Sequence, residues 1–209
     1  AGRPLAAPIP LGFPGGDGHA IPEYNPEKAR EMLAAAGLGD GFTLQTIYPD
    51  LNVYGVDFNL MMQKIQQDLS KVGVTLELQP VPFANWREAA NGDHIPLTAV
   101  FLAPDFFGPS QGIDVFGMQE GSVWAKRAGG ENAAAIVTPR PGELKTQALA
   151  APTAEAAEAL WAEAAQEMIN NRIIIPMVSP DLILAYGPNI KGVRYSACCN
   201  LPLAEITNN

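Results

Sequence analysis

An acidic side chain between aromatic rings is the feature of this sequence with the clearest chemistry. Asp105 is followed by Phe106 and Phe107 and comes directly after a short apolar run, residues 97–102. Such a run predicts a strand buried on both faces, and open α/β sheets bind ligands beyond the carboxyl ends of their strands. A carboxylate beside aromatic faces binds a cation through charge and through the ring quadrupole. These three residues are therefore candidates for binding a ligand. The alternative is that Asp105 caps a turn while both rings fill the core.

Two further groups of side chains are candidates for ligand contact. Trp124, Lys126 and Arg127 follow within the same predicted loop. An indole and neighbouring cations are suited to stacking on or pairing with an anionic group, although a solvated loop surface has the same composition. Tyr54 lies in another predicted loop, residues 49–55, where its hydroxyl would reach a ligand. The sequence thus predicts Trp124, Arg127 and Tyr54 as additional binding residues.

Motifs for catalysis and for metal binding are scarce. No GxSxG, GxxxxGK[ST] or GxGxxG motif follows a predicted strand, and the spacings HExxH and CxxC are absent. Asp93 and His94 are neighbours, and neighbours on a strand point to opposite faces. The sequence therefore predicts a binding protein with no catalytic residue, cofactor or metal. The alternative is a hydrolase-like enzyme that uses Asp93 with His94, or Asp105.

Apolar periodicity indicates alternating helices and strands. Asn25 and Pro26 predict the start of a helix over residues 24–36. A strand, a helix and a strand then follow at 42–48, 56–72 and 74–78, which is the pattern of a parallel βαβ unit. The remaining predicted elements are a helix at 83–90, a strand at 97–102, a long loop at 103–142, helices at 143–150 and after Thr153, and strands at 173–178 and 181–186. The predicted fold class is α/β, with a mixed, mainly parallel sheet flanked by helices.

Composition divides the chain and limits its partners. Residues 1–22 are rich in Pro and Gly and predict an extended lead-in, residues 23–186 an α/β ligand-binding lobe, and residues 187–209 a tail. The net charge of −9 disfavours binding to nucleic acid. No apolar run approaches the roughly 20 residues that cross a bilayer. Cys198 and Cys199 are adjacent, which predicts two thiols or a bridge to a cysteine outside this chain.

The order of these features resembles family 5 of the extracellular solute-binding proteins of ABC importers, the oligopeptide-, dipeptide- and nickel-binding type. The resemblance rests on segments spread along the chain: YNPEKAREMLAAAGLGDGF (24–42), DLSKVGVTLELQPVPFANW (68–86), APDFFGP (103–109), AEALWAEAAQEMI with RIIIPMV (157–178), and NIKGVRYS (189–196). It implies a lobe like those of type II periplasmic binding proteins, which close two lobes over a solute.

Under this resemblance the chain is the C-terminal lobe, a fragment of a two-lobed protein, and the tail from 187 returns toward a missing N-terminal lobe. Asp105 would receive the α-ammonium group of the solute. Peptide-binding members commonly have Trp a few residues earlier, where this chain has Leu102. The implied solute is therefore a peptide, an amino-acid derivative or a sugar conjugate. The implied protein partner is an ABC transporter permease. The implied location is periplasmic or extracytoplasmic, with the protein either lipid-anchored or soluble.

Overall fold

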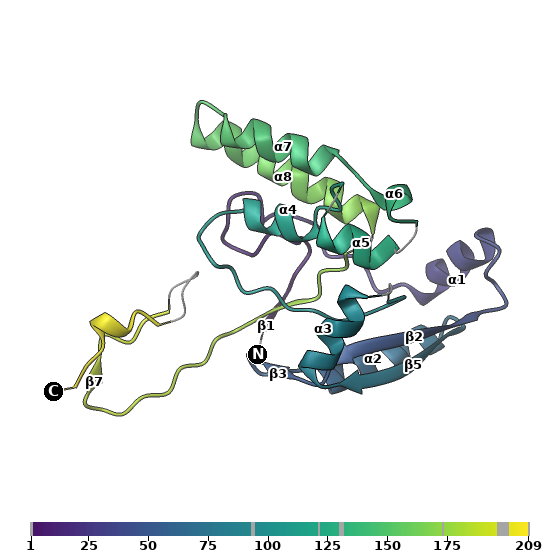
Figure 1. The fold of residues 1–209 in the computed structure, drawn as a ribbon, viewed down its shortest axis with the longest axis horizontal. Coiled ribbons are helices and arrows are strands. Elements are labelled where there is room, and N and C mark those ends of the chain that lie inside the picture. The colour runs from purple at the N-terminus through teal and green to yellow at the C-terminus, as the bar shows by residue number, and fades with distance from the viewer. Residues whose placement is uncertain are drawn as a thin grey trace. The chain divides into compact units, whose positions relative to one another are not determined.

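The computed structural model describes residues 2–92, 95–120, 122–129, 132–172, 174–195 and 201–208 (Figure 1). Backbone contacts divide the chain into two compact units, each described here by itself. The first unit comprises Ala1–Ala20, Leu102–Gln119 and Thr138–Asn209, and the second comprises Ile21–Phe101 and Glu120–Val137. The sequence-based boundaries after residues 22 and 186 remain predictions.

A parallel βαβ unit forms the centre of the second unit. Strands β2 (Phe42–Pro49) and β5 (Val74–Val81) pair in parallel, with Phe42 opposite Val74 and Pro49 opposite Val81. Helix α2 (Phe58–Ser70) makes the crossover between them. Its amino end is fixed by Asp57, whose side chain accepts a hydrogen bond from the Leu60 amide at 3.0 Å. The strand–helix–strand prediction is confirmed.

The core of this unit lies between α2 and the sheet. Tyr48, Phe58, Met62 and Ala99 form one buried cluster. Phe58 and Met62 lie four residues apart on α2 and therefore share a face. The other elements of the unit are α1 (Pro26–Ala35), the hairpin of β3 (Asn52–Val53) and β4 (Val56–Asp57), α3 (Phe83–Asn91), α5 (Val123–Gly129) and α6 (Ala133–Ile136).

The predicted strand at 97–102 is wrong in most of its length. Only one isolated parallel bridge, between Thr46 and Leu97, joins this segment to β2. The next residue, Thr98, is held by side-chain hydrogen bonds. Its hydroxyl donates to the Ile47 carbonyl at 2.6 Å and accepts from the Trp86 indole at 2.9 Å. These side-chain bonds replace the backbone ladder that a strand would have needed.

Helices dominate the first unit. Helices α7 (Arg140–Leu149) and α8 (Ala154–Asn171) form a hairpin, and α4 (Ser110–Phe116) packs against both. Thr153 caps α8 by accepting a hydrogen bond from the Ala156 amide, as the sequence predicted. Large, fully buried side chains of this unit come from the lead-in, from the three helices and from the segment that follows α4, and they include Ile9, Ile113, Met118, Leu144 and Met168.

Two other predictions from the sequence need correction. The segment 103–142 is not one loop, because α4, α5, α6 and the start of α7 lie within it. Its Gly and Pro residues are compatible with helix, since Pro141 occupies an early position of α7 and needs no donor there. The predicted strands 173–178 and 181–186 reduce to β6 (Val178–Pro180), which pairs antiparallel with β1 (Gly2–Pro4).

The remaining described elements are short. Strands β7 (Ile190–Lys191) and β8 (Thr207–Asn208) pair antiparallel beside the 3₁₀ helix at Leu203–Glu205. Among the described residues the longest ladder is parallel and the three shorter ones are antiparallel, so the predicted mixed α/β class is confirmed. In the described residues, no helix combines the length and apolar character that a membrane span requires.

Candidate functional site

The Asp105 carboxylate is exposed and held in a defined orientation. Gln111 makes a reciprocal pair with it: the Gln111 side chain accepts from the Asp105 amide at 2.8 Å and donates to Asp105 Oδ2 at 2.6 Å. Gln111 lies in the first turn of α4, which follows the loop directly. Among the described residues no side chain pairs with Oδ1 and no cation lies within ion-pair distance. The carboxylate thus has one oriented acceptor available to a ligand.

The two aromatic side chains beside Asp105 are open to solvent. Phe106 is 48% exposed and Phe107 64% exposed, so neither fills the core of the first unit. Phe107 nevertheless packs against Phe13 of the lead-in, with ring centroids 4.6 Å apart. Asp105, Phe106 and Phe107 thus form one exposed acidic and aromatic segment, which we call the Asp105 patch.

The lead-in supports the Asp105 patch, and this supporting role was not predicted from the sequence. Figure 1 shows the lead-in, in purple, looping beside α4 and α8. Ile9 and Phe13 are buried, and a side chain at Gly112 of α4 would lie 3.0 Å from the Pro8 carbonyl oxygen. The signal that could have revealed this role is the set of apolar residues among the Pro and Gly of this segment. Phe13 and Gln111 are the supporting residues that sequence reasoning missed.

Trp124 and Arg127 meet in the second unit. The Arg127 guanidinium carbon lies 4.7 Å from the centroid of the Trp124 ring, one turn of α5 away. Trp124 is buried and Arg127 half-buried, so this pair is not the solvated loop surface that was the alternative. Arg127 also donates to the Asn91 side-chain oxygen at the end of α3.

Tyr54 lies at the tip of the hairpin between β3 and β4. Tyr54 and Gly55 have φ values of 51° and 81°, the two positive values of a type I′ turn. The Tyr54 side chain is exposed and stays a predicted ligand contact. Tyr48, by contrast, is buried, and its hydroxyl donates to Asn59 at 3.0 Å. Burial, followed by the charges of Asp50 and Asp57, raises the pKa of Tyr48.

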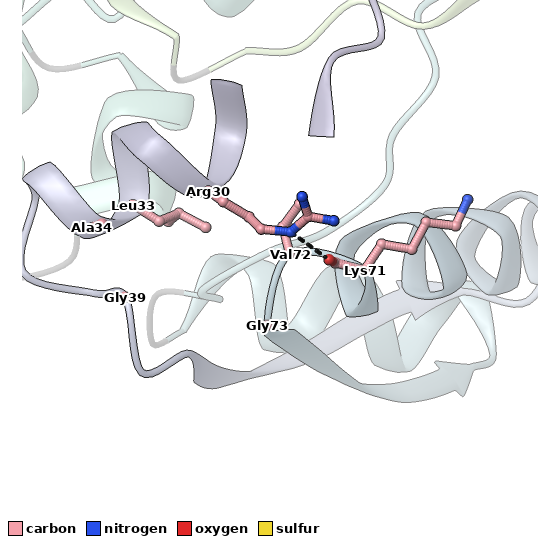
Figure 2. A pocket seen from close by; sticks show the side chains of 7 residues that line it. All are labelled: Arg30, Leu33, Ala34, Gly39, Lys71, Val72 and Gly73. Carbon is pink, nitrogen blue, oxygen red and sulfur yellow. Dashed lines mark hydrogen bonds between the residues drawn. The ribbon is translucent and has the colours of Figure 1, made fainter. Parts of the chain in front are cut away.

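A shallow groove in the second unit lies between the ends of α1 and α2. Figure 2 shows its lining residues, with the Arg30 side chain reaching across to the Lys71 carbonyl oxygen at 3.1 Å. Arg30 thereby satisfies an open carbonyl at the carboxyl end of α2. Lys71 pairs with Asp68, and hydrogen bonds from Lys64 and Lys71 lower the pKa of Asp68 to about 2. Because its charges are already paired, the groove is better explained as a helix-capping contact than as a ligand site.

The Asp93 and His94 pair of the predicted catalytic alternative and the two cysteines fall on residues that the structure does not describe. Asp93 and His94 lie between the described ranges, as do Cys198 and Cys199. Within the described ranges, no group of three or more His, Cys, Asp or Glu side chains is arranged to bind a metal ion. Tyr54, Trp124 and Arg127 belong to one unit and the Asp105 patch to the other.

Solved structures share this fold over nearly the whole chain. HbpA2 from Haemophilus parasuis matches with a TM-score of 0.78 and 19% identity, covering 100% of this chain and 40% of that one. The dipeptide-binding protein from Pseudoalteromonas sp. SM9913, in complex with Met-Leu, gives a TM-score of 0.79 at 17% identity, with coverages of 100% and 40%. MoaA from A. tumefaciens R10, in complex with mannopinic acid, gives 0.65 at 22% identity, with coverages of 85% and 34%.

These similarities define the fold as that of a lobe of a type II periplasmic binding protein. The chain spans about 40% of the length of the first two of these structures. No protein of curated function matches the sequence. Residues 1–122 match the family described as bacterial extracellular solute-binding proteins, family 5 Middle. This chain belongs to that family, which confirms the resemblance drawn from the sequence segments.

Proposed function

We propose that this chain is the C-terminal lobe of the solute-binding component of an ABC importer. It captures a peptide-like or small zwitterionic solute between itself and an N-terminal lobe. The single observation that carries this proposal is the Asp105 patch, an exposed carboxylate with one free acceptor oxygen, flanked by two exposed rings. Such a patch binds an ammonium group through charge and through the ring faces. Its role is binding rather than catalysis.

The similar structures support this choice of solute. One holds the dipeptide Met-Leu, which carries a free ammonium group and a carboxylate, and another holds mannopinic acid. A peptide, an amino-acid derivative and a sugar conjugate therefore all remain within the proposed class. Tyr54, Trp124 and Arg127 are proposed to supply further contacts to the solute.

Exposed apolar side chains in the first unit support an intramolecular partner. Ile175, Met177, Ile183 and Tyr186 are exposed along a mostly extended segment that includes β6. Exposed apolar side chains gathered on one segment mark a surface that another protein surface covers. We assign that covering surface to the N-terminal lobe, toward which the 187–209 tail would return. The second proposed partner is the permease of the importer, which would bind the closed protein with its solute. The proposed location is therefore outside the cytoplasm, where an importer receives its solute.

Nuclear magnetic resonance of the 209-residue chain tests the proposal. Met-Leu and N-acetyl-Met-Leu differ in the ammonium group, so we expect only Met-Leu to shift the backbone amide signals of the Asp105 patch. Asp105→Asn removes the negative charge and keeps the side-chain shape. We expect it to weaken Met-Leu binding by up to about fivefold, since exposed ion pairs contribute up to about 1 kcal/mol.

Asp114→Asn is the matched control for this experiment. Asp114 lies on α4 and is paired with Lys145 outside the Asp105 patch. We expect this variant to bind Met-Leu as the unchanged chain does. Equal shifts with the acetylated dipeptide, or equal losses in both variants, would show that Asp105 does not receive an ammonium group.

A further inference from the structure

Arg127 has a donor that no described residue satisfies. Its guanidinium stacks on Trp124 and donates from Nη2 to Asn91. The Nε–H group is buried and has no hydrogen-bond acceptor within the described ranges. Buried donors of this kind cost about 1–3 kcal/mol when unpaired, and a charged group costs more. A molecule that supplies an acceptor at this point would therefore recover a substantial free energy.

The surrounding charge favours an anion at the same point. Arg87, on α3, is near enough for its charge to act on Arg127: burial first and then Arg87 lower the pKa of Arg127. The guanidinium still stays charged at neutral pH, because arginine has an intrinsic pKa above about 12. No carboxylate of the described residues lies within ion-pair distance of either arginine, although the chain as a whole has a net charge of −9.

Three other arginines of the chain have hydrogen-bond or ion-pair acceptors, in contrast to the Arg127 Nε–H group. Arg30 donates from Nε to the Lys71 carbonyl, and Arg194 donates from Nε to Glu205. Arg140 pairs with Glu143 and Glu163. Arg127 instead combines a half-buried guanidinium, a buried Nε–H with no acceptor among the described residues and a second cation near enough to act on its charge.

We propose that Arg127, assisted by the charge of Arg87 and oriented by Trp124 and Asn91, binds a carboxylate group of the solute. A planar carboxylate matches the planar guanidinium, and its oxygen accepts from Nε–H as a charge-assisted hydrogen bond. This inference deepens the proposed function. It rests on that function because it assumes that the bound carboxylate belongs to the transported solute. It narrows the solute class to compounds with a carboxylate. The residues involved all belong to the second unit.

Arginine side-chain spectra test this site directly. Titration of the folded 209-residue chain with succinate is expected to move the Nε–H signal of Arg127 downfield until it saturates. The signals of Arg30 and Arg194 act as internal controls, since their Nε–H groups already have acceptors. The Arg127 signal is assigned by its loss in Arg127→Lys, a variant that keeps one positive charge.

Variants give the expected size of the effect. Arg127→Lys loses the planar donor group, and we expect succinate to bind at least tenfold more weakly, since charge-assisted hydrogen bonds contribute about 1.5–3 kcal/mol. Arg87→Gln is expected to weaken binding about threefold and to reduce its dependence on salt, because it acts through charge alone. Circular dichroism verifies that both variants retain the fold.

Four outcomes would overturn the carboxylate site. The first is no movement of the Arg127 signal with succinate, and the second is an equal movement with chloride at the same ionic strength. The third is a preference for inorganic phosphate over succinate. The fourth is displacement of the signal by Asp93→Asn or Glu131→Gln without any ligand, because the acceptor would then be a carboxylate of the chain itself. If Met-Leu still shifts the Asp105 patch in these cases, the proposed function stands without this site.

Discussion

Gly15→Ala is expected to destabilise the first unit by about 3 kcal/mol. Gly15 has φ +76°, which costs a residue with a side chain about 1–2 kcal/mol. A Cβ atom there would also lie 2.5 Å from the backbone nitrogen of Ala162 and from the backbone carbon of Trp161. Because these are backbone atoms of α8, the clash is relieved only by moving the lead-in, and overpacking of this kind costs about 1–3 kcal/mol. Thermal denaturation should show a midpoint lower by about 6–12 °C.

Gly12→Ala is the matched control for this substitution. Gly12 lies in the same lead-in with φ +81°, but a Cβ atom there would meet nothing within 4 Å. It should therefore show the cost of the backbone conformation alone, about 1–2 kcal/mol. If both variants lose the same stability, the lead-in does not pack closely on α8. Gly15→Ala should also broaden the amide signals of the Asp105 patch, since Phe13 supports Phe107 from the same segment.

Leu144→Ala is expected to cost about 3 kcal/mol of unfolding free energy. The Leu144 side chain is 0% exposed and lies on α7, which packs along α8. Its truncation removes apolar contacts and leaves a cavity that a tightly packed helix hairpin only partly closes, and such changes cost about 2–5 kcal/mol. Urea denaturation followed by circular dichroism measures the loss.

The same helix offers a control of identical chemistry. Leu149 is 68% exposed at the end of α7, and Leu149→Ala should change the unfolding free energy by less than about 0.5 kcal/mol. Leucine and alanine are both strong helix formers, so neither variant is affected by helix propensity. Equal losses of unfolding free energy at both positions would mean that burial of the Leu144 side chain within the α7–α8 hairpin does not stabilise the fold.

Local sequence signals were sufficient for α1, α2, α3, α7 and α8 and for the one long parallel pair, but they missed α4, α5 and α6, which lie in the segment predicted as a loop. Asn25 and Thr153 cap α1 and α8 as predicted, because capping depends only on side chains a few residues from the helix start. The prediction of a strand at 97–102 was wrong because the contacts of this segment are not local in sequence. Its pairing depends on Thr98 and Trp86, which meet through the fold and not through neighbouring sequence.

The residues of the candidate sites likewise fall into those that the sequence predicts and those that only the structure reveals. Asp105, Phe106 and Phe107 are adjacent in sequence, so their proximity required no tertiary information. The residues that support or extend the candidate sites required the structure: Phe13 reaches Phe107 across about 90 positions of sequence, and Asn91 reaches Arg127 from another helix. Such contacts leave no periodic signal, because neither partner lies on the helix or strand of the other.

By itself the sequence determined the α/β class, the helix caps, the parallel βαβ unit and the acidic and aromatic composition of the Asp105 patch. These depend on side-chain periodicity and on contacts between residues a few positions apart. The tertiary structure was needed to find that Ile9 and Phe13 of the lead-in are buried, that Phe106 and Phe107 face solvent, and that the Arg127 Nε–H lacks an acceptor within the described ranges. Burial and unsatisfied donors arise when distant segments pack, and no local pattern encodes which segments meet.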